Sequence, residues 1–176
     1  KTYLSGNDVC NTTVTIGDET ILDGFIVEKA VQDGIYGNAV DFVVKNCVLN
    51  ENNLNGIRGI DGNISILWCD IKDNGNNGID VQGSNKSVYV ENCKIFDNDW
   101  NGIFSQYSTP TILNSIIHHN ASDISYYSDT YHGIKLYYPS STPEIRNNTI
   151  VYNSNEGIYF TGVNEPYIDN CILWGN

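Results

Sequence analysis

The segment NCKIFDNDWNGIF (residues 92–104) has side chains at a spacing that could bind calcium. Four of them stand at offsets 1, 3, 5 and 6 of an EF-hand loop: Asp97, Asp99, Asn101 and Gly102. An EF-hand also needs a glutamate at offset 12, where this chain has Ser108, and it needs flanking helices. Because ENNLNG and DNGNNG occur elsewhere with a similar composition, we interpret the segment as one copy of a repeated turn.

Histidine and cysteine are the other residue types that could bind a metal or do redox chemistry. A zinc site needs several such ligands that converge. His118 and His119 would point to opposite sides of an extended strand, so we do not expect them to bind one metal ion. The five cysteines include no C-x-x-C motif, which disfavours both zinc and redox chemistry.

The composition excludes several classes of partner. The formal net charge is -12, from 21 acidic and 9 basic residues, whereas nucleic acids and anionic membranes select basic surfaces. No apolar run approaches the roughly 18 residues that a transmembrane helix needs.

The chain has no methionine and begins at Lys1, so we expect a processed chain or a fragment of a longer protein, with residues 1–176 forming a single domain.

A repeat of about 22 to 24 residues organises the chain. The segment NCVLNENNLNGI recurs as WCDIKDNGNNGI and NCKIFDNDWNGI, and more degenerate copies follow. Each unit holds three short alternations of apolar and polar residues, separated by Asn/Gly turns, which is typical of short strands. The sequence therefore predicts an all-β parallel β-solenoid of about seven coils with one long loop insertion at residues 121–132.

A leucine-rich repeat is the alternative fold. The segment VKNCVLNENNL fits that consensus, and the period lies in its range. The last leucine of the consensus is replaced in the other copies, for example by Trp100, and the rest of each unit has no helical periodicity. Both features favour the solenoid.

The aligned copies form columns with distinct physical roles. Cys47, Cys69 and Cys93 share an inward column and are expected to be buried thiols, since parallel neighbours in register are awkward for disulfides. Asparagine tolerates left-handed backbone geometry, and its amide can bond to the next coil. We expect such a ladder from Asn52, Asn74, Asn98, Asn120, Asn153 and Asn176.

A column of carboxylates precedes the asparagines. Glu51, Asp73 and Asp97 would stack at the coil spacing of about 4.8 Å, where they repel each other unless water or a cation separates them. We predict at most a weak surface calcium site there, and no other cofactor.

The pattern TILDGFIV, then I-x-N-C-x-I-x-x-N, then N-G-I resembles the right-handed parallel β-helix repeats of the pectin-lyase-like superfamily. It is most similar to the generic repeats of secreted and cell-surface proteins, and it covers residues from about Val14 to Asn176. The resemblance implies a right-handed coil, three parallel sheets and frequent contact with carbohydrate.

The resemblance also implies where chemistry would occur, because lyases and hydrolases of the superfamily use the outward face of the sheet that follows the Gly turn. There the weak catalytic candidates are Arg58, Asp80 and Lys135, which could pair with a uronate carboxylate. Aromatic residues of the same face could stack on sugars: Tyr36, Phe104, Tyr137 and Tyr159. The alternative is a solvated face with Arg58 and Asp80 paired across coils.

The long insertion is the other candidate for ligand binding. It is expected to form a lip over the same face. Its aromatic candidates are Tyr126, Tyr127, Tyr131 and His132. Contact with carbohydrate, contact with protein and a purely structural insertion all remain open.

These features favour an extracellular, non-enzymatic β-helix module with a structural, surface-layer or adhesive role. Such a module could assemble end to end with copies of itself or with adjoining β-helix sequence, because solenoid ends are unpaired edges. The alternative is a carbohydrate-active enzyme, either a polysaccharide lyase or a glycoside hydrolase, or a carbohydrate-binding module with a polysaccharide partner.

Overall fold

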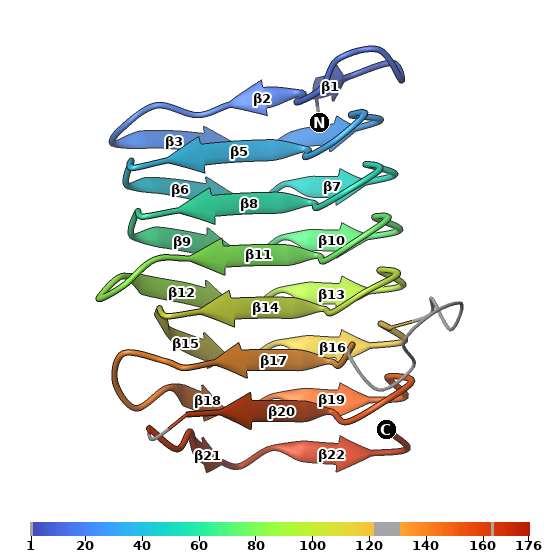
Figure 1. Cartoon of the computed structure of the whole chain (residues 1–176). Helices are drawn as coiled ribbons and strands as arrows, with labels where there is room; N and C mark the ends of the chain where they lie inside the picture. The colour runs from blue at the N-terminus through green and yellow to red at the C-terminus, as the bar shows by residue number, and fades with distance from the viewer. Residues whose placement is uncertain (1, 122–130, 163) are drawn as a thin grey trace.

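The computed structural model describes residues 2–121, 131–162 and 164–176, and every regular element in these ranges is a β-strand. The strands wind into a parallel β-solenoid of about seven coils with three sheets along its length (Figure 1). This confirms the all-β prediction and rules out the leucine-rich repeat. Tyr126 and Tyr127 lie outside the described residues. The described chain forms no helix that could cross a membrane.

Each sheet takes one strand from each coil. Sheet A contains β1 (Thr2–Ser5), β4 (Phe25–Glu28), β7 (Val48–Asn50), β10 (Asp70–Lys72), β13 (Lys94–Phe96), β16 (Ile116–His118), β19 (Thr149–Val151) and β22 (Ile172–Trp174). Sheet B contains β2 (Val14–Thr15), β5 (Ile35–Asn38), β8 (Ile57–Ile60), β11 (Ile79–Gln82), β14 (Ile103–Gln106), β17 (Ile134–Tyr137) and β20 (Ile158–Thr161). Sheet C contains β3 (Thr20–Asp23), β6 (Phe42–Lys45), β9 (Ile64–Leu67), β12 (Ser87–Glu91), β15 (Thr109–Leu113), β18 (Glu144–Arg146) and β21 (Tyr167–Asp169).

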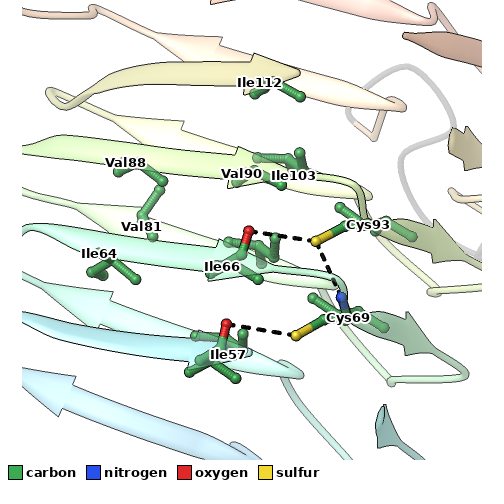
Figure 2. Close-up of a cluster of buried hydrophobic side chains, with 14 of the residues drawn as sticks. Ile57, Ile64, Ile66, Cys69, Val81, Val88, Val90, Cys93, Ile103 and Ile112 are labelled. Atoms are coloured by element: carbon green, nitrogen blue, oxygen red, sulfur yellow. Dashed lines mark hydrogen bonds between the residues drawn. The ribbon is translucent and has the colours of Figure 1, made fainter. Parts of the chain in front are cut away.

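The coils stack in register, so equivalent residues of successive coils are neighbours. In sheet B, Ile57 pairs with Ile79, which pairs with Ile103, and all three side chains are fully buried. Sheets A and C contribute similar inward columns, and the three columns meet to form one elongated core (Figure 2). Apolar residues that recur at one position of the repeat therefore stack on one another in the core.

The cysteine column faces the core, as predicted. Cys47, Cys69 and Cys93 are buried, and their thiols are free. The Cys93 thiol donates to the Ile66 carbonyl at 3.5 Å (Figure 2). The adjacent Cys69 thiol and burial both raise the pKa of the Cys47 thiol well above its usual value.

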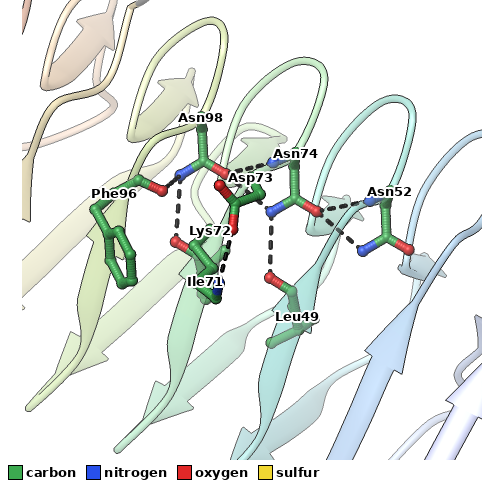
Figure 3. Close-up of polar contacts among 8 residues, drawn as sticks. All are labelled: Leu49, Asn52, Ile71, Lys72, Asp73, Asn74, Phe96 and Asn98. Atoms are coloured by element: carbon green, nitrogen blue, oxygen red, sulfur yellow. Dashed lines mark hydrogen bonds and ion pairs between the residues drawn. The ribbon is translucent and has the colours of Figure 1, made fainter.

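The predicted asparagine ladder is continuous. The amide of Asn52 donates to Oδ1 of Asn74, and the amide of Asn74 donates to Oδ1 of Asn98, each at 2.9 Å (Figure 3). The ladder continues in the same way through Asn120, Asn153 and Asn176. The turn between each ladder asparagine and sheet B brings the backbones of adjacent coils close together. A Cβ on Gly78 would lie 2.7 Å from the Gly102 carbonyl oxygen, which explains the repeated glycine.

Candidate functional site

The outward face of sheet B aligns the candidate residues in one column. The register pairs Tyr36 with Arg58, Arg58 with Asp80, Asp80 with Phe104, Phe104 with Lys135 and Lys135 with Tyr159. The pleat places these side chains outward because the isoleucines that precede them point into the core. The structure therefore brings the three catalytic candidates onto one face.

Asp80 is a buried carboxyl group within this outward column. Its side chain is only 7% exposed, although it belongs to an outward column. Oδ1 accepts a hydrogen bond from Nε2 of Gln82 at 3.0 Å. Burial raises the pKa of the Asp80 carboxyl, and this effect outweighs the opposing hydrogen bond from Gln82 and the charge of Arg58. Nε of Arg58 is buried and has no hydrogen-bond partner among the described residues.

The pKa of Lys135 is shifted in the direction opposite to that of Asp80. Burial lowers the pKa of its ammonium group. Its Nζ lies over the ring of Tyr159, 5.7 Å from the ring centroid. A raised carboxyl pKa and a lowered lysine pKa bring both groups closer to neutral pH, where each could transfer a proton.

A depression of about 280 Å³ opens between these residues. Its rim includes Trp100 and Tyr131, whose rings stack with centroids 4.9 Å apart and planes at 8°. The lining residues are Asn77, Asp80, Gln82, Trp100, Asn101, Phe104, Tyr131 and Lys135. Tyr131 comes from the end of the insertion and lines the depression beside Trp100.

His132 is more deeply buried than an exposed lip residue would be. Its side chain is 1% exposed, and Nδ1 lies 2.7 Å from Oε2 of Glu156. Its ring stacks on Tyr159 with centroids 4.6 Å apart. Burial lowers the pKa of His132, and the charge of Lys135 adds to this, while Glu156 opposes it. His132 is therefore packed between its neighbours beside Tyr159 and is not an exposed lip residue.

A second buried ladder underlies the start of sheet B, and sequence reasoning missed it. Oδ1 of Asn77 accepts from the amide of Asn101 at 2.8 Å, and Oδ1 of Asn101 accepts from the backbone N–H of His132 at 2.8 Å. Asp33 accepts from Asn55 in the same column. The available signal was the Asp or Asn before most Gly–Ile pairs, which resembles an ordinary turn residue.

The carboxylate column lies at the corner after sheet A. Glu51, Asp73 and Asp97 have left-handed backbone angles, with φ of 54°, 52° and 53°. Nζ of Lys72 lies 2.7 Å from Oδ2 of Asp73 (Figure 3), and the charges of Glu51 and Asp97 also raise the pKa of Lys72. Among the described residues, no three His, Cys, Asp or Glu side chains form a group able to hold a metal ion. Calcium binding here stays a prediction.

The two adjacent histidines do not diverge. The expectation that they point apart is wrong, because Nδ1 of His118 and Nδ1 of His119 lie 2.7 Å apart. His118 ends β16, whereas His119 turns the corner with φ of 53°. A left-handed residue reverses the alternation of an extended strand, so both rings reach the same side.

Comparison with known proteins agrees with this architecture. A family model for right-handed β-helix regions matches residues 9–173. The chain belongs to the right-handed β-helix family. No curated protein sequence matches this member significantly.

Among solved structures, the β-helix resembles the periplasmic alginate epimerase AlgG T265N mutant, with 19% identity and a TM-score of 0.71, over 93% of this chain and 38% of that one. It also resembles the pectate lyase Pel9A, with 19% identity and a TM-score of 0.61, over 74% of this chain and 37% of that one. The A-module of Azotobacter vinelandii mannuronan C-5 epimerase AlgE4 has 14% identity and a TM-score of 0.64, over 92% of this chain and 55% of that one. The chain thus spans less than two thirds of each structure, and at these identities the likeness establishes the fold alone.

Proposed function

We propose that sheet B binds an acidic polysaccharide and removes the proton next to the carboxylate of one uronate unit. One observation carries this proposal: Asp80, with a raised pKa, and Lys135, with a lowered pKa, line the same aromatic-rimmed depression. Two neighbouring titratable groups whose pKa values are shifted in opposite directions are typical of sites that do acid–base catalysis. The names of the similar structures support the substrate class, since pectate and mannuronan are polymers of uronates.

The residues have distinct roles in this proposal. Lys135 takes the proton, because desolvation favours its neutral form. Arg58 stands in the row next to Asp80, outside the lining of the depression, and adds positive potential near the uronate carboxylate without contacting the carbon that loses its proton. Asp80 donates a hydrogen bond while it is protonated. With rows about 4.8 Å apart, Asp80 and Lys135 lie roughly 10 Å apart on either side of Phe104, so a sugar stacked on that ring is flanked by both groups.

Two outcomes can follow the loss of this proton. In β-elimination, the C4–O glycosidic bond breaks as the C4–C5 double bond forms, and the departing oxygen takes a proton from water. In epimerisation, water returns a proton to the opposite face of C5, which inverts that carbon. Both reactions require the same first step, which is the step that the proposal assigns to sheet B.

Binding must rely on short-range contacts. The chain has a net charge of -12, so its long-range field opposes a polyanion. Charge attraction at the site therefore comes from Arg58, since Lys135 acts as the neutral base, and substitution of Arg58 should weaken the affinity for polyuronate.

The test compares Lys135→Met with Lys94→Met, which removes an exposed lysine from β13 on sheet A. Each protein is incubated with polygalacturonate and with polymannuronate in deuterated buffer. Ultraviolet absorbance detects the unsaturated product of elimination, and proton NMR detects exchange at C5. We expect activity in the parent and in Lys94→Met, and a loss of about 100-fold or more in Lys135→Met. Absence of binding, cleavage and exchange with every polyuronate would refute the proposal.

A structural role is the second candidate. In the last coil, Ile168 and Leu173 are 44% and 47% exposed, whereas Ile145 and Ile150 one coil earlier are fully buried. A further coil or another copy of the chain could cover these side chains and extend the sheets. Analytical ultracentrifugation tests this candidate, since a concentration-dependent series of larger species supports end-to-end association and a single monomeric species opposes it. We extend both proposals to an extracellular or cell-surface location, where polymeric uronates occur.

A further inference from the structure

The aromatic residues of sheet B are not spread evenly along the solenoid. They gather at both ends of two adjacent strands, β14 and β17, which lie side by side in Figure 1. Trp100 and Tyr131 stack at the start of these strands. Tyr107 and Tyr138 follow their ends and form a second pair, with centroids 6.3 Å apart and planes at 21°.

The second pair is available to a ligand. Tyr107 and Tyr138 are 45% and 49% exposed, and the ring of Tyr137 meets Tyr138 edge-on with centroids 4.7 Å apart. Exposed aromatic faces suit the apolar faces of sugar rings, because stacking buries apolar area and leaves the sugar hydroxyl groups hydrogen-bonded to water. Tyr107 follows Trp100 by seven positions in the sequence, so the two pairs lie at most about 24 Å apart.

The depression already described begins at the Trp100–Tyr131 pair. Phe104 and Lys135 are the second residues of β14 and β17, and Asp80 borders them from β11. The second pair lies beyond the lining of the depression, at the far ends of the same two strands. Along the solenoid axis, in contrast, aromatic contact is interrupted, because Arg58 and Asp80 separate Tyr36 from Phe104. The continuous aromatic path therefore runs along the strands and across the axis.

We propose that the polysaccharide crosses sheet B along β14 and β17, transverse to the solenoid axis, and stacks on the Trp100–Tyr131 and Tyr107–Tyr138 pairs at its two sides. This inference rests on the proposed function and specifies how the same site holds its substrate. It predicts a site of fixed length: affinity rises with oligomer length until one oligomer reaches both pairs, and longer oligomers gain nothing more.

The test measures the dissociation constants of galacturonate and mannuronate oligomers of increasing length by calorimetry. The main variant is Tyr107→Asn with Tyr138→Asn, since both positions have left-handed backbone angles that asparagine tolerates. Trp68→Asn is the matched control: Trp68 is also left-handed, is 52% exposed and occupies a column that holds asparagine in most other coils. Tyr36→Ala probes the axial path. Circular dichroism verifies the fold of each variant.

For the transverse path, the double variant should lose about tenfold or more in affinity for long oligomers and nothing for short ones. Trp68→Asn and Tyr36→Ala should match the parent. A loss in Tyr36→Ala without a loss in the double variant would overturn the transverse path in favour of an axial one. If the parent binds and all variants bind equally, the path is wrong and the proposed function stands. If the parent binds no oligomer, the proposed function fails and the path fails with it.

Discussion

Replacement of Asn74 by alanine tests whether the buried ladder carries a large share of the stability of the solenoid. Its Oδ1 accepts from the backbone N–H of Asn52 at 3.2 Å and from the side-chain amide of Asn52 at 2.9 Å. Its own amide donates to the Leu49 carbonyl at 3.3 Å and to Oδ1 of Asn98 at 2.9 Å. Alanine abolishes all four hydrogen bonds at a site that is 1% exposed.

The magnitude follows from the groups left behind. The N–H of Asn52 loses its partner within the ladder, and a buried donor without a partner costs about 1 to 3 kcal/mol. The other groups keep partners, such as the Val27 carbonyl for the Asn52 amide at 3.4 Å, so each lost bond costs about 0.5 to 1.5 kcal/mol. We expect Asn74→Ala to lower the free energy of unfolding by about 3 to 5 kcal/mol.

Two controls make the test specific. Asn53→Ala changes the exposed neighbour and should alter stability by less than about 0.5 kcal/mol. Asn176→Ala removes the exposed end of the ladder, where water can replace the lost partner, and should cost about 1 kcal/mol. Urea unfolding followed by circular dichroism measures all three values. A cost below about 1 kcal/mol for Asn74→Ala, or equal costs at Asn74 and Asn176, would refute the reasoning.

Two further predictions concern titratable groups. In the folded protein, iodoacetamide should modify the exposed Cys10 and spare Cys47, because the Cys47 thiol is buried and its pKa is strongly raised. Mass spectrometry of protein labelled before and after unfolding checks this. Rapid labelling of Cys47 in the folded protein would contradict it. The pKa of His132 is lowered in the fold from its ordinary 6.5, so on acidification the unfolded chain gains a proton before the folded chain does. The free energy of unfolding should therefore fall as pH drops below about 6.5, and it should fall less steeply with pH in His132→Gln than in the parent. Urea unfolding midpoints of both proteins at two pH values test this. Identical pH dependence in the two proteins would refute it.

The sequence predicted the columns of the fold because the coils stack without offset. Residues that recur at one position in each repeat, such as Cys69 and Cys93, then share one environment, and the pleat determines whether it is the core or the solvent. The asparagine ladder followed for the same reason, since each amide meets its own copy one coil away.

The environment within the site was harder to predict. Asp80 belongs to an outward column, yet it is buried beside a depression whose rim comes from Trp100 in the turn and Tyr131 in the insertion. Side chains from a degenerate turn and an irregular loop do not follow the repeat, so their position cannot be inferred from it. The corner at His119 was missed because its left-handed conformation is not evident from a residue type other than glycine or asparagine.

The stacked register has a mechanical consequence. Hydrogen bonds between coils point along the solenoid axis, so tension on that axis loads all three sheets of one interface at the same time. The interfaces lie in series, and the weakest one sets the breaking force. The first interface joins β1 to β4 by four residue pairs, β2 to β5 by two and β3 to β6 by four, whereas among the described strands β22 joins β19 by three pairs in sheet A alone. The described solenoid, pulled along its axis, should therefore yield first at β22 and then peel one coil at a time.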